Sequence, residues 1–290
     1  MQYRTFGRTG LKVSEIGFGG AQIGIPDYME TWDPEGGQEQ ETIINAVHHA
    51  LDLGLNYIDT APAYGKGISE EVLGRALVGR RDECVLATKL SEYDGESVMR
   101  SAEESLRRLQ TDRIDVLQFH GGIYEQEAQD AVFERGGLEA LRRLRDHGKI
   151  RFLGFTTELP SGGVSKLIAS DAFDVMQVRY NFMYQDSCDF IDGRGVMREA
   201  EAHRMGIVVM RPMTSGICQR LLPQVFPQLA GADLNAFLLN YVLSNPFVDV
   251  AIVGMRRREE VEANNALSDD RPARLDLAKV HDRFFPRDAS

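Results

Sequence analysis

Cysteine is scarce in this sequence, and basic residues are outnumbered by acidic ones. The three cysteines, Cys84, Cys188 and Cys218, lie far apart and belong to no CxxC or Cys/His cluster. We therefore expect no disulfide framework and no metal site, and a reducing compartment fits this usage. Lysine and arginine number 33 against 44 aspartates and glutamates, a formal net charge of −11. This balance argues against a broad surface for nucleic acid, although a local basic pocket is still allowed.

The sequence also lacks any long hydrophobic run. No stretch approaches the roughly 18 apolar residues of a membrane-spanning helix. The segment from Met1 to Gly10 lacks the apolar stretch of a signal peptide. We therefore expect a cytoplasmic protein with no membrane partner. Its 43% hydrophobic and 27% charged content is typical of a folded globular chain.

Short apolar runs recur along almost the whole chain. Each run is brief and apolar on both faces, as is typical of strands buried in a parallel sheet. The eight runs are Ile16–Gly19, Tyr57–Asp59, Val85–Lys89, Ile114–His120, Phe152–Thr156, Val175–Arg179, Ile207–Met210 and Val250–Val253.

Helical patterns separate these runs. In Glu41–Leu53 the apolar residues recur on one helix face, and Gly54 then suits a helix C-terminus. Eight strands that are each followed by a helix predict an α/β fold of the (β/α)8 TIM-barrel type. The alternative, a doubly wound open sheet, would usually carry a GxGxxG turn that Gly17–Gly20 does not match. We expect a single domain over residues 1–290, with a β-hairpin cap at 1–14 and a C-terminal tail at 269–290.

Four predicted connections between a strand and its following helix are long. In a TIM barrel these connections surround the active site, and long ones are often binding loops. Their aromatic side chains either line an apolar substrate pocket or pack the loops against the barrel. The long connections are Gly20–Glu39, Gly121–Gly137, Asn181–Gly195 and Pro212–Asp233. The pocket candidates are Tyr28, Trp32 and Tyr124 from these connections and Tyr93, which follows the third predicted strand.

Four polar residues stand at or just after the carboxyl ends of successive strands. Asp59 ends the second predicted strand, with Tyr64 five residues later, while Lys89 and His120 end the third and fourth. A lysine ammonium beside a tyrosine favours the phenolate and lowers the phenol pKa. A carboxylate such as Asp59 would hold that lysine charged, and His120 would orient a carbonyl oxygen. Together they predict acid–base catalysis by Tyr64 at a polarised carbonyl.

The residues around this set resemble the aldo/keto reductase family. The likeness runs from about Tyr3 to Leu267. The matching segments are Asn56–Gly65 and Ser105–His120 for two family signatures, Gly154–Thr156 and Gln177–Asn181 for the fifth and sixth strands, and Ile252–Asn264 near the C-terminus.

The resemblance implies a barrel that binds a nicotinamide cofactor extended across its mouth, without a Rossmann fold. It implies Tyr64 as general acid, Asp59 and Lys89 as the residues that tune it, and His120 as the orienting donor. Met210 stands where the family often stacks a tyrosine on the nicotinamide. The cofactor contacts that it implies are Gly20, Thr156, Gln177, Met210, Arg211, Pro212, Met213, Ser215, Gly254, Met255, Arg256 and Asn264.

The form of the cofactor depends on the segment after the last strand. Many relatives clasp the 2′-phosphate of NADP there with Lys-Ser and a later arginine, whereas this chain has Arg256, Arg257 and Arg258. Arginine binds phosphate bidentately, so NADP is favoured. Glu260 stands near the position of the later arginine and would repel a phosphate, so NAD stays open.

Three functions are compatible with these residues. The first is NAD(P)H-dependent interconversion of an aldehyde, ketone or sugar carbonyl and its alcohol. The second is an NAD-dependent sugar or alcohol dehydrogenase of the same family. The third is a redox-sensing regulatory barrel without catalysis. The expected partner is a small-molecule carbonyl or alcohol, and the expected assembly is a monomer or a weak homo-oligomer.

Overall fold

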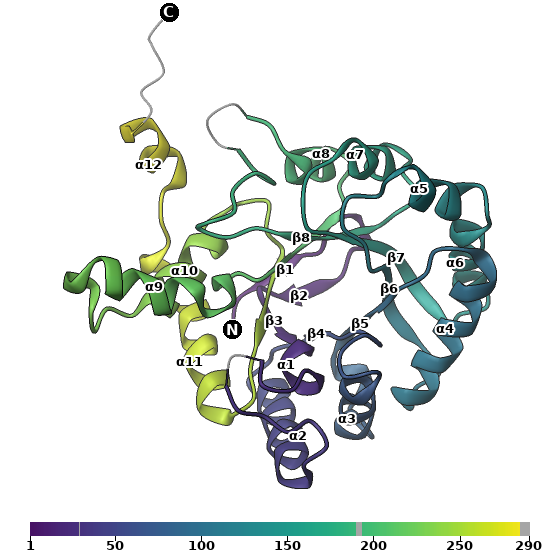
Figure 1. Cartoon of the computed structure of the whole chain (residues 1–290), viewed down its shortest axis with the longest axis horizontal. Helices are drawn as coiled ribbons and strands as arrows, with labels where there is room; N and C mark the ends of the chain where they lie inside the picture. The colour runs from purple at the N-terminus through teal and green to yellow at the C-terminus, as the bar shows by residue number, and fades with distance from the viewer. Residues whose placement is uncertain (29, 190–192, 285–290) are drawn as a thin grey trace, which may run out of the picture.

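The computed structural model describes residues 1–28, 30–189 and 193–284. Within these residues, eight parallel strands close into a barrel, and β10 pairs with both β9 and β3. Figure 1 shows the barrel with its helices outside. The strands are β3 (Ile16–Gly19), β4 (Tyr57–Asp59), β5 (Val85–Leu90), β6 (Ile114–Phe119), β7 (Ile150–Thr157), β8 (Val175–Arg179), β9 (Gly206–Met210) and β10 (Val250–Gly254).

A helix follows each barrel strand, which confirms the predicted TIM barrel. Side chains at helix starts explain several boundaries: the carboxylates of Asp94 and Asp233 and the hydroxyl of Ser161 each accept a hydrogen bond from a backbone N–H of the first turn. The helices are α2 (Gly37–Asp52), α3 (Ile68–Ala76), α4 (Gly95–Arg108), α6 (Gly137–Asp146), α7 (Gly162–Ala169), α8 (Val196–Ala202), α10 (Leu234–Leu243) and α11 (Arg258–Asp269).

The predicted N-terminal hairpin closes the amino-terminal end of the barrel. Strands β1 (Tyr3–Thr5) and β2 (Lys12–Ser14) pair antiparallel around the short helix η1 (Gly7–Thr9). Phe6 is fully buried, and its ring meets that of Tyr57 edge-on at 5.6 Å. It belongs to the same apolar cluster as the inward-facing strand residues. The opposite end of the barrel is therefore the end available for a site.

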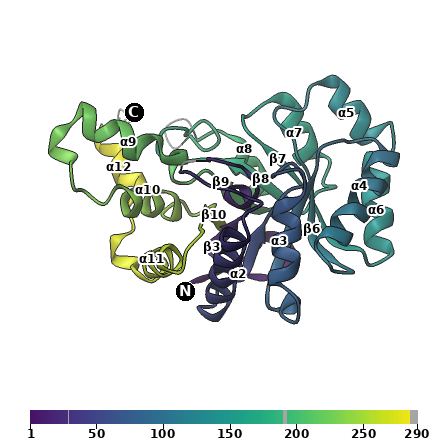
Figure 2. The same cartoon turned by 60° about the horizontal axis from the view of Figure 1, so that its bottom comes forward.

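Two of the predicted long connections contain helices that the sequence reading missed. Helix α5 (Gln126–Phe133) lies before α6, and α9 (Ile217–Val225) lies before α10. Pro223 inside α9 explains the second omission, because proline usually marks a helix boundary. A short α1 (Ala21–Gly24) follows β3, and α12 (Leu277–Phe284) ends the described chain. Figure 2 shows α9, α10 and α12 on the side of the barrel opposite α4 and α6.

No helix in the described part of the chain is both long enough and apolar enough to cross a membrane.

Candidate active site

The parallel strands bring the four predicted catalytic residues to one end of the barrel. Asp59 is the last residue of β4, Lys89 lies near the end of β5, and His120 directly follows β6. The strand register pairs Asp59 with Ala87 and Lys89 with Gln118, so these strand ends stand next to one another. Tyr64 lies in the turn between β4 and α3.

Lys89 is the centre of the group. Its Nζ donates to Asp59 Oδ1 and Oδ2 at 2.8 and 2.6 Å and to the backbone oxygen of Thr60 at 2.7 Å. The hydroxyl of Tyr64 lies 3.5 Å from the same Nζ. The side chains of Lys89 and Asp59 are each only 1% exposed. An ammonium held by this many oxygens is fixed in position and stays charged despite its burial.

Tyr64 is half-buried and lies between Lys89 and His120. Lys89 Nζ is 5.1 Å from the centre of the Tyr64 ring, and the His120 ring meets it edge-on at 6.1 Å. Gly65 has a φ of +67°, and a Cβ there would lie 2.3 Å from Gly24 O. Glycine therefore lets the Tyr64 turn pack directly against α1, which positions the phenol.

The pKa of Tyr64 moves in the direction opposite to the one the sequence predicts. Burial raises this pKa above its ordinary value, and the Lys89 ammonium only partly offsets the rise. Tyr64 is therefore a neutral phenol at neutral pH, the form that donates a proton.

Burial and the charge of Lys89 together lower the pKa of His120 to about 4. Its imidazole is consequently neutral at physiological pH, and one ring nitrogen still carries a proton to donate.

A pair of buried glutamines lies beside these four residues, and only one of the two was predicted from the sequence. Gln118 Nε2 donates to Gln177 Oε1 at 3.1 Å, and Gln177 Nε2 lies 3.9 Å from Met210 Sδ. Burial raises the pKa of Asp59, while the Lys89 ammonium and both amides oppose that shift. Gln118 Oε1 is buried without a partner among the described residues. Gln118 could have been identified from the sequence, because it is a polar residue within the apolar run that forms β6.

The ends of β7 and β9 hold further residues predicted to contact a cofactor. The Thr156 hydroxyl bonds to both the N–H and the carbonyl of Gly121, at 3.1 and 3.2 Å. It thereby ties β7 to the residue after His120. Met210 ends β9 and is half-buried. Gly20 directly follows β3 and is buried, and Gly254 is the last residue of the adjoining strand β10.

The segment after β9 forms a tight turn that leads into α9. Thr214, Ser215 and Gly216 have positive φ angles of 54°, 50° and 73°, and α9 begins at the next residue. The N–H groups of Thr214 and Gly216 donate to the backbone oxygens of Arg211 and Met213 at 3.0 and 3.1 Å, and the N–H of Cys218 donates to Thr214 Oγ1 at 3.1 Å. These backbone donors are therefore already used to fix the start of α9.

The residues just before this segment, which were also predicted to contact a cofactor, differ in their exposure. Pro212 is buried and Met213 half-buried. Arg211 is exposed and pairs with Glu158 at 2.9 Å, so its charge is already partly neutralised. The Tyr28 hydroxyl lies 3.3 Å from Ser215 Oγ, which links the β3–α2 connection to the segment after β9.

The structure corrects the prediction for the segment after β10. Met255 is fully buried, and Arg256 is 1% exposed. The Arg256 guanidinium donates to backbone oxygens of Gln22 and Tyr28 and lies 4.3 Å from the Trp32 ring. It holds the connection before α2 rather than facing solvent. Asn264 Nδ2 donates to Glu260 O at 2.8 Å within α11.

Two of the four aromatic residues predicted to line a substrate pocket are instead packed into the core. Trp32 is 7% exposed and donates to Ile23 O, and Tyr124 is 3% exposed and donates to Phe119 O. Large rings with a satisfied polar atom gain more from burial than from solvent exposure. Tyr28 and Tyr93 are half-buried near the site, and Tyr93 donates to the backbone oxygen of His120.

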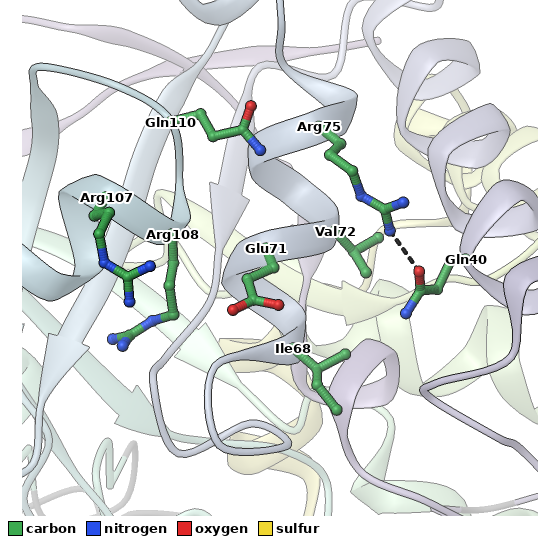
Figure 3. A pocket seen from close by; sticks show the side chains of 8 residues that line it. All are labelled: Gln40, Ile68, Glu71, Val72, Arg75, Arg107, Arg108 and Gln110. Atoms are coloured by element: carbon green, nitrogen blue, oxygen red, sulfur yellow. Dashed lines mark hydrogen bonds between the residues drawn. The ribbon is translucent and has the colours of Figure 1, made fainter.

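A separate hollow of about 440 Å³ lies on the outer face of the barrel. Figure 3 shows its polar lining from α2, α3 and α4, including Arg75, which bonds to Gln40. None of the predicted site residues lines it. Across residues 1–28, 30–189 and 193–284, no group of three or more His, Cys, Asp or Glu side chains is placed to hold a metal.

A family model connects this site to known proteins. Residues 15–276 match the model of the aldo/keto reductase family, and this range contains all eight barrel strands. The chain therefore belongs to the aldo/keto reductase family and is an oxidoreductase of that family.

Individual relatives agree with this assignment. L-galactose dehydrogenase from Arabidopsis thaliana is 27% identical, over 92% of this chain and 88% of its own. The holo form of aldo-keto reductase AKR11C1 from Bacillus halodurans superimposes with a TM-score of 0.78 at 25% identity, covering 98% and 96% of the two chains. An aldo/keto reductase from Klebsiella pneumoniae, solved with NADP and acetate, gives 0.74 at 25% identity and covers 99% and 96%.

Proposed function

We propose that this protein interconverts a carbonyl compound and its alcohol, with Tyr64 as the general acid and base. The observation that carries the proposal is the contact of the Tyr64 hydroxyl with an ammonium that Asp59 and Thr60 hold in place. A nicotinamide dinucleotide would supply the hydride. The substrate is a small-molecule aldehyde, ketone or sugar, or the corresponding alcohol.

Each of the four residues has a separate task in the proposed reaction. The neutral His120 imidazole donates a hydrogen bond to the carbonyl oxygen and orients it. Tyr64 transfers its phenolic proton to that oxygen as negative charge develops there. Lys89 stabilises the phenolate that is left, and Asp59 keeps Lys89 charged. In the reverse direction the Tyr64 phenolate takes the proton from the alcohol.

The residues that would hold the cofactor lie at the carboxyl ends of β7 to β10. The amide of Gln177 suits the nicotinamide carboxamide, and Met210 suits one ring face. The Ser215 hydroxyl accepts from Tyr28 and keeps its own proton to donate to the pyrophosphate. The sequence favours NADP through Arg256–Arg258. The burial of Arg256 weakens that expectation and leaves Arg257 and Arg258 as the exposed cations.

Replacing Tyr64 with phenylalanine tests the proposed acid. Tyr64→Phe removes the proton donor and keeps the ring, so kcat for carbonyl reduction should fall by about 100-fold or more. The dissociation constant of the cofactor, measured by isothermal titration, should change less than about twofold. A variant that keeps the wild-type rate would overturn the role of Tyr64.

A panel of carbonyl compounds separates catalysis from redox sensing. Turnover of at least one aldehyde, ketone or sugar that is lost in Tyr64→Phe supports the proposed enzyme. Tight cofactor binding with no turnover of any compound supports a sensor instead.

We also propose that residues 1–290 form a single domain and that the protein is a monomer or a weak homo-oligomer. Measuring the mass of the protein in solution tests the proposed assembly.

A further inference from the structure

Glu30 lies against the arginines that were expected to bind a 2′-phosphate. Its carboxylate oxygen Oε1 is 2.9 Å from Arg256 Nη1 and 3.0 Å from Arg257 Nη1. Glu30 belongs to the connection between β3 and α2, whereas the arginines follow β10, so only the fold brings these charges together. The nearby guanidinium groups, Arg257 above all, lower the pKa of Glu30 below its usual range, and the residue is a carboxylate at neutral pH.

A second carboxylate, Glu260 in the first turn of α11, lies beside the same arginines. Its Oε2 accepts hydrogen bonds from the backbone N–H groups of Arg256 at 2.6 Å and Arg257 at 3.1 Å. Its Oε1 lies 3.5 Å from Arg257 Nη1. Backbone N–H groups at a helix N-terminus are the donors that a phosphate would otherwise use. In this chain a carboxylate already satisfies them.

The donors of Arg256 are almost fully used within the protein. Nε and Nη2 bond to Gln22 O at 3.0 and 2.9 Å, Nη2 also reaches Tyr28 O at 3.3 Å, and Nη1 bonds to Glu30. Because the side chain is only 2% exposed, it has little freedom to turn towards a ligand. The side chains of Arg257 and Glu30 are 44% and 41% exposed.

We propose that Glu30, supported by Glu260, makes the cofactor site select NAD(H) over NADP(H). The inference rests on the proposed function, because it assumes that a nicotinamide dinucleotide places its adenosine ribose beside Arg257. A 2′-phosphate there would meet two carboxylates and would have to displace Glu30 from both arginines. A ribose hydroxyl carries no charge and can donate a hydrogen bond to a carboxylate, which is how an acidic residue favours NAD in other dinucleotide sites.

Titration of NAD+ and NADP+ into wild-type protein and Glu30→Gln tests the proposal without turnover. Glutamine keeps the size of the side chain and removes its charge. We expect wild-type protein to bind NAD+ more tightly than NADP+. In Glu30→Gln, NADP+ should bind about tenfold more tightly, the effect of roughly one unit of charge repulsion near the surface, and NAD+ should change less than about threefold.

Glu35→Gln is the matched control. Glu35 lies in the same connection, is exposed, and has no side-chain partner among the described residues. Glu35→Gln should leave the ratio of the NAD+ and NADP+ affinities unchanged.

The ratio of the NAD+ and NADP+ affinities of wild-type protein should also shrink when salt rises from about 0.05 to 0.5 M, because exposed charges are then screened.

The outcomes separate this inference from the proposed function. If both dinucleotides bind but wild-type protein prefers NADP+, or Glu30→Gln leaves their ratio unchanged, the role of Glu30 is refuted while the proposed chemistry stands. If neither dinucleotide binds, both proposals fail. If the ratio shifts as expected but no carbonyl is turned over, selectivity is supported and the proposed catalysis fails. Emission from Trp32, beside Arg256, gives an independent readout of binding.

Discussion

Two influences are common to the titration of Tyr64 and of His120. Burial favours the neutral form of each side chain, which raises the pKa of Tyr64 and lowers that of His120. The Lys89 ammonium lowers both values, so it opposes burial at the phenol and adds to it at the imidazole. At neutral pH the site therefore presents two uncharged donors beside one fixed cation.

His120 gives a pH-dependent stability that can be measured. Its pKa of about 4 in the folded protein lies below the ordinary value of 6.5, so the unfolded chain binds an extra proton between these values. The contribution of the neutral His120 to the free energy of unfolding is fully present above about pH 6.5 and is lost as the pH falls towards 4. In His120→Asn, the drop in unfolding free energy from pH 7 to 5 should be about 1–2 kcal/mol smaller than in wild-type protein.

Urea denaturation at pH 5, 6 and 7 measures this difference. The exposed His147 provides the control, and His147→Asn should leave the pH dependence as it is in wild-type protein. Parallel pH profiles for wild-type protein and His120→Asn would contradict the lowered pKa of His120.

At the scale of elements, the connection between β3 and α2 is held by one buried arginine. Arg256 binds the backbone at Gln22 and Tyr28, pairs with Glu30 and packs on Trp32. Tyr28 in turn reaches Ser215 across the barrel mouth. Arg256 therefore positions this connection.

Arg256→Ala is consequently expected to weaken NAD+ and NADP+ binding together, by roughly fivefold or more. The substitution removes the guanidinium that donates to the backbone oxygens of Gln22 and Tyr28 and loosens the connection. Titration measures the affinities, and Trp32 emission should shift to the red as the ring becomes exposed. Loss of NADP+ affinity alone would show instead that Arg256 reads the 2′-phosphate. Arg258→Ala, at an exposed position, should leave the emission unchanged.

At the scale of the whole molecule, a buried carboxylate joins distant segments at the closed end of the barrel. Glu15 stands between β2 and β3 and is 4% exposed. It accepts hydrogen bonds from Arg4 in the hairpin, from Ser268 in α11 and from Arg274 beyond α11. Arg274 also bonds to Asn240 of α10. The two ends of the described chain are thereby tied to the barrel.

Arg274→Ala should lower the free energy of unfolding by about 2–3 kcal/mol. Glu15 keeps Arg4 but loses a second cation, and the buried Asn240 loses its donor. Urea unfolding measures the change, with the dependence on denaturant concentration expected to stay the same. Arg271→Ala is the control, because Arg271 is exposed three residues away. An equal loss in both variants would show that the Glu15 contacts are not the cause.

Most of the barrel could be predicted from local pattern. Strands β3, β4 and β8 begin and end where their apolar runs do, because a strand buried on both faces has a continuous apolar sequence. Helices α5 and α9 were missed, because α5 begins with a polar stretch and Pro223 in α9 usually marks a helix boundary. The grouping of Asp59, Lys89 and His120 at one end of the barrel was also predictable, because parallel strands bring residues at their carboxyl ends together.

The sequence by itself determined the order of the barrel strands and the set of Asp59, Tyr64, Lys89 and His120, because these follow from local periodicity and from position along a strand. The family followed from the resemblance of its motifs to known signatures. Only the tertiary structure decided the net pKa shifts, the burial of Trp32, Tyr124 and Arg256, and the pairing of Glu30 with the arginines. Burial and charge pairing depend on which segments meet in space, and Glu30 and Arg257 are more than 200 residues apart in the chain.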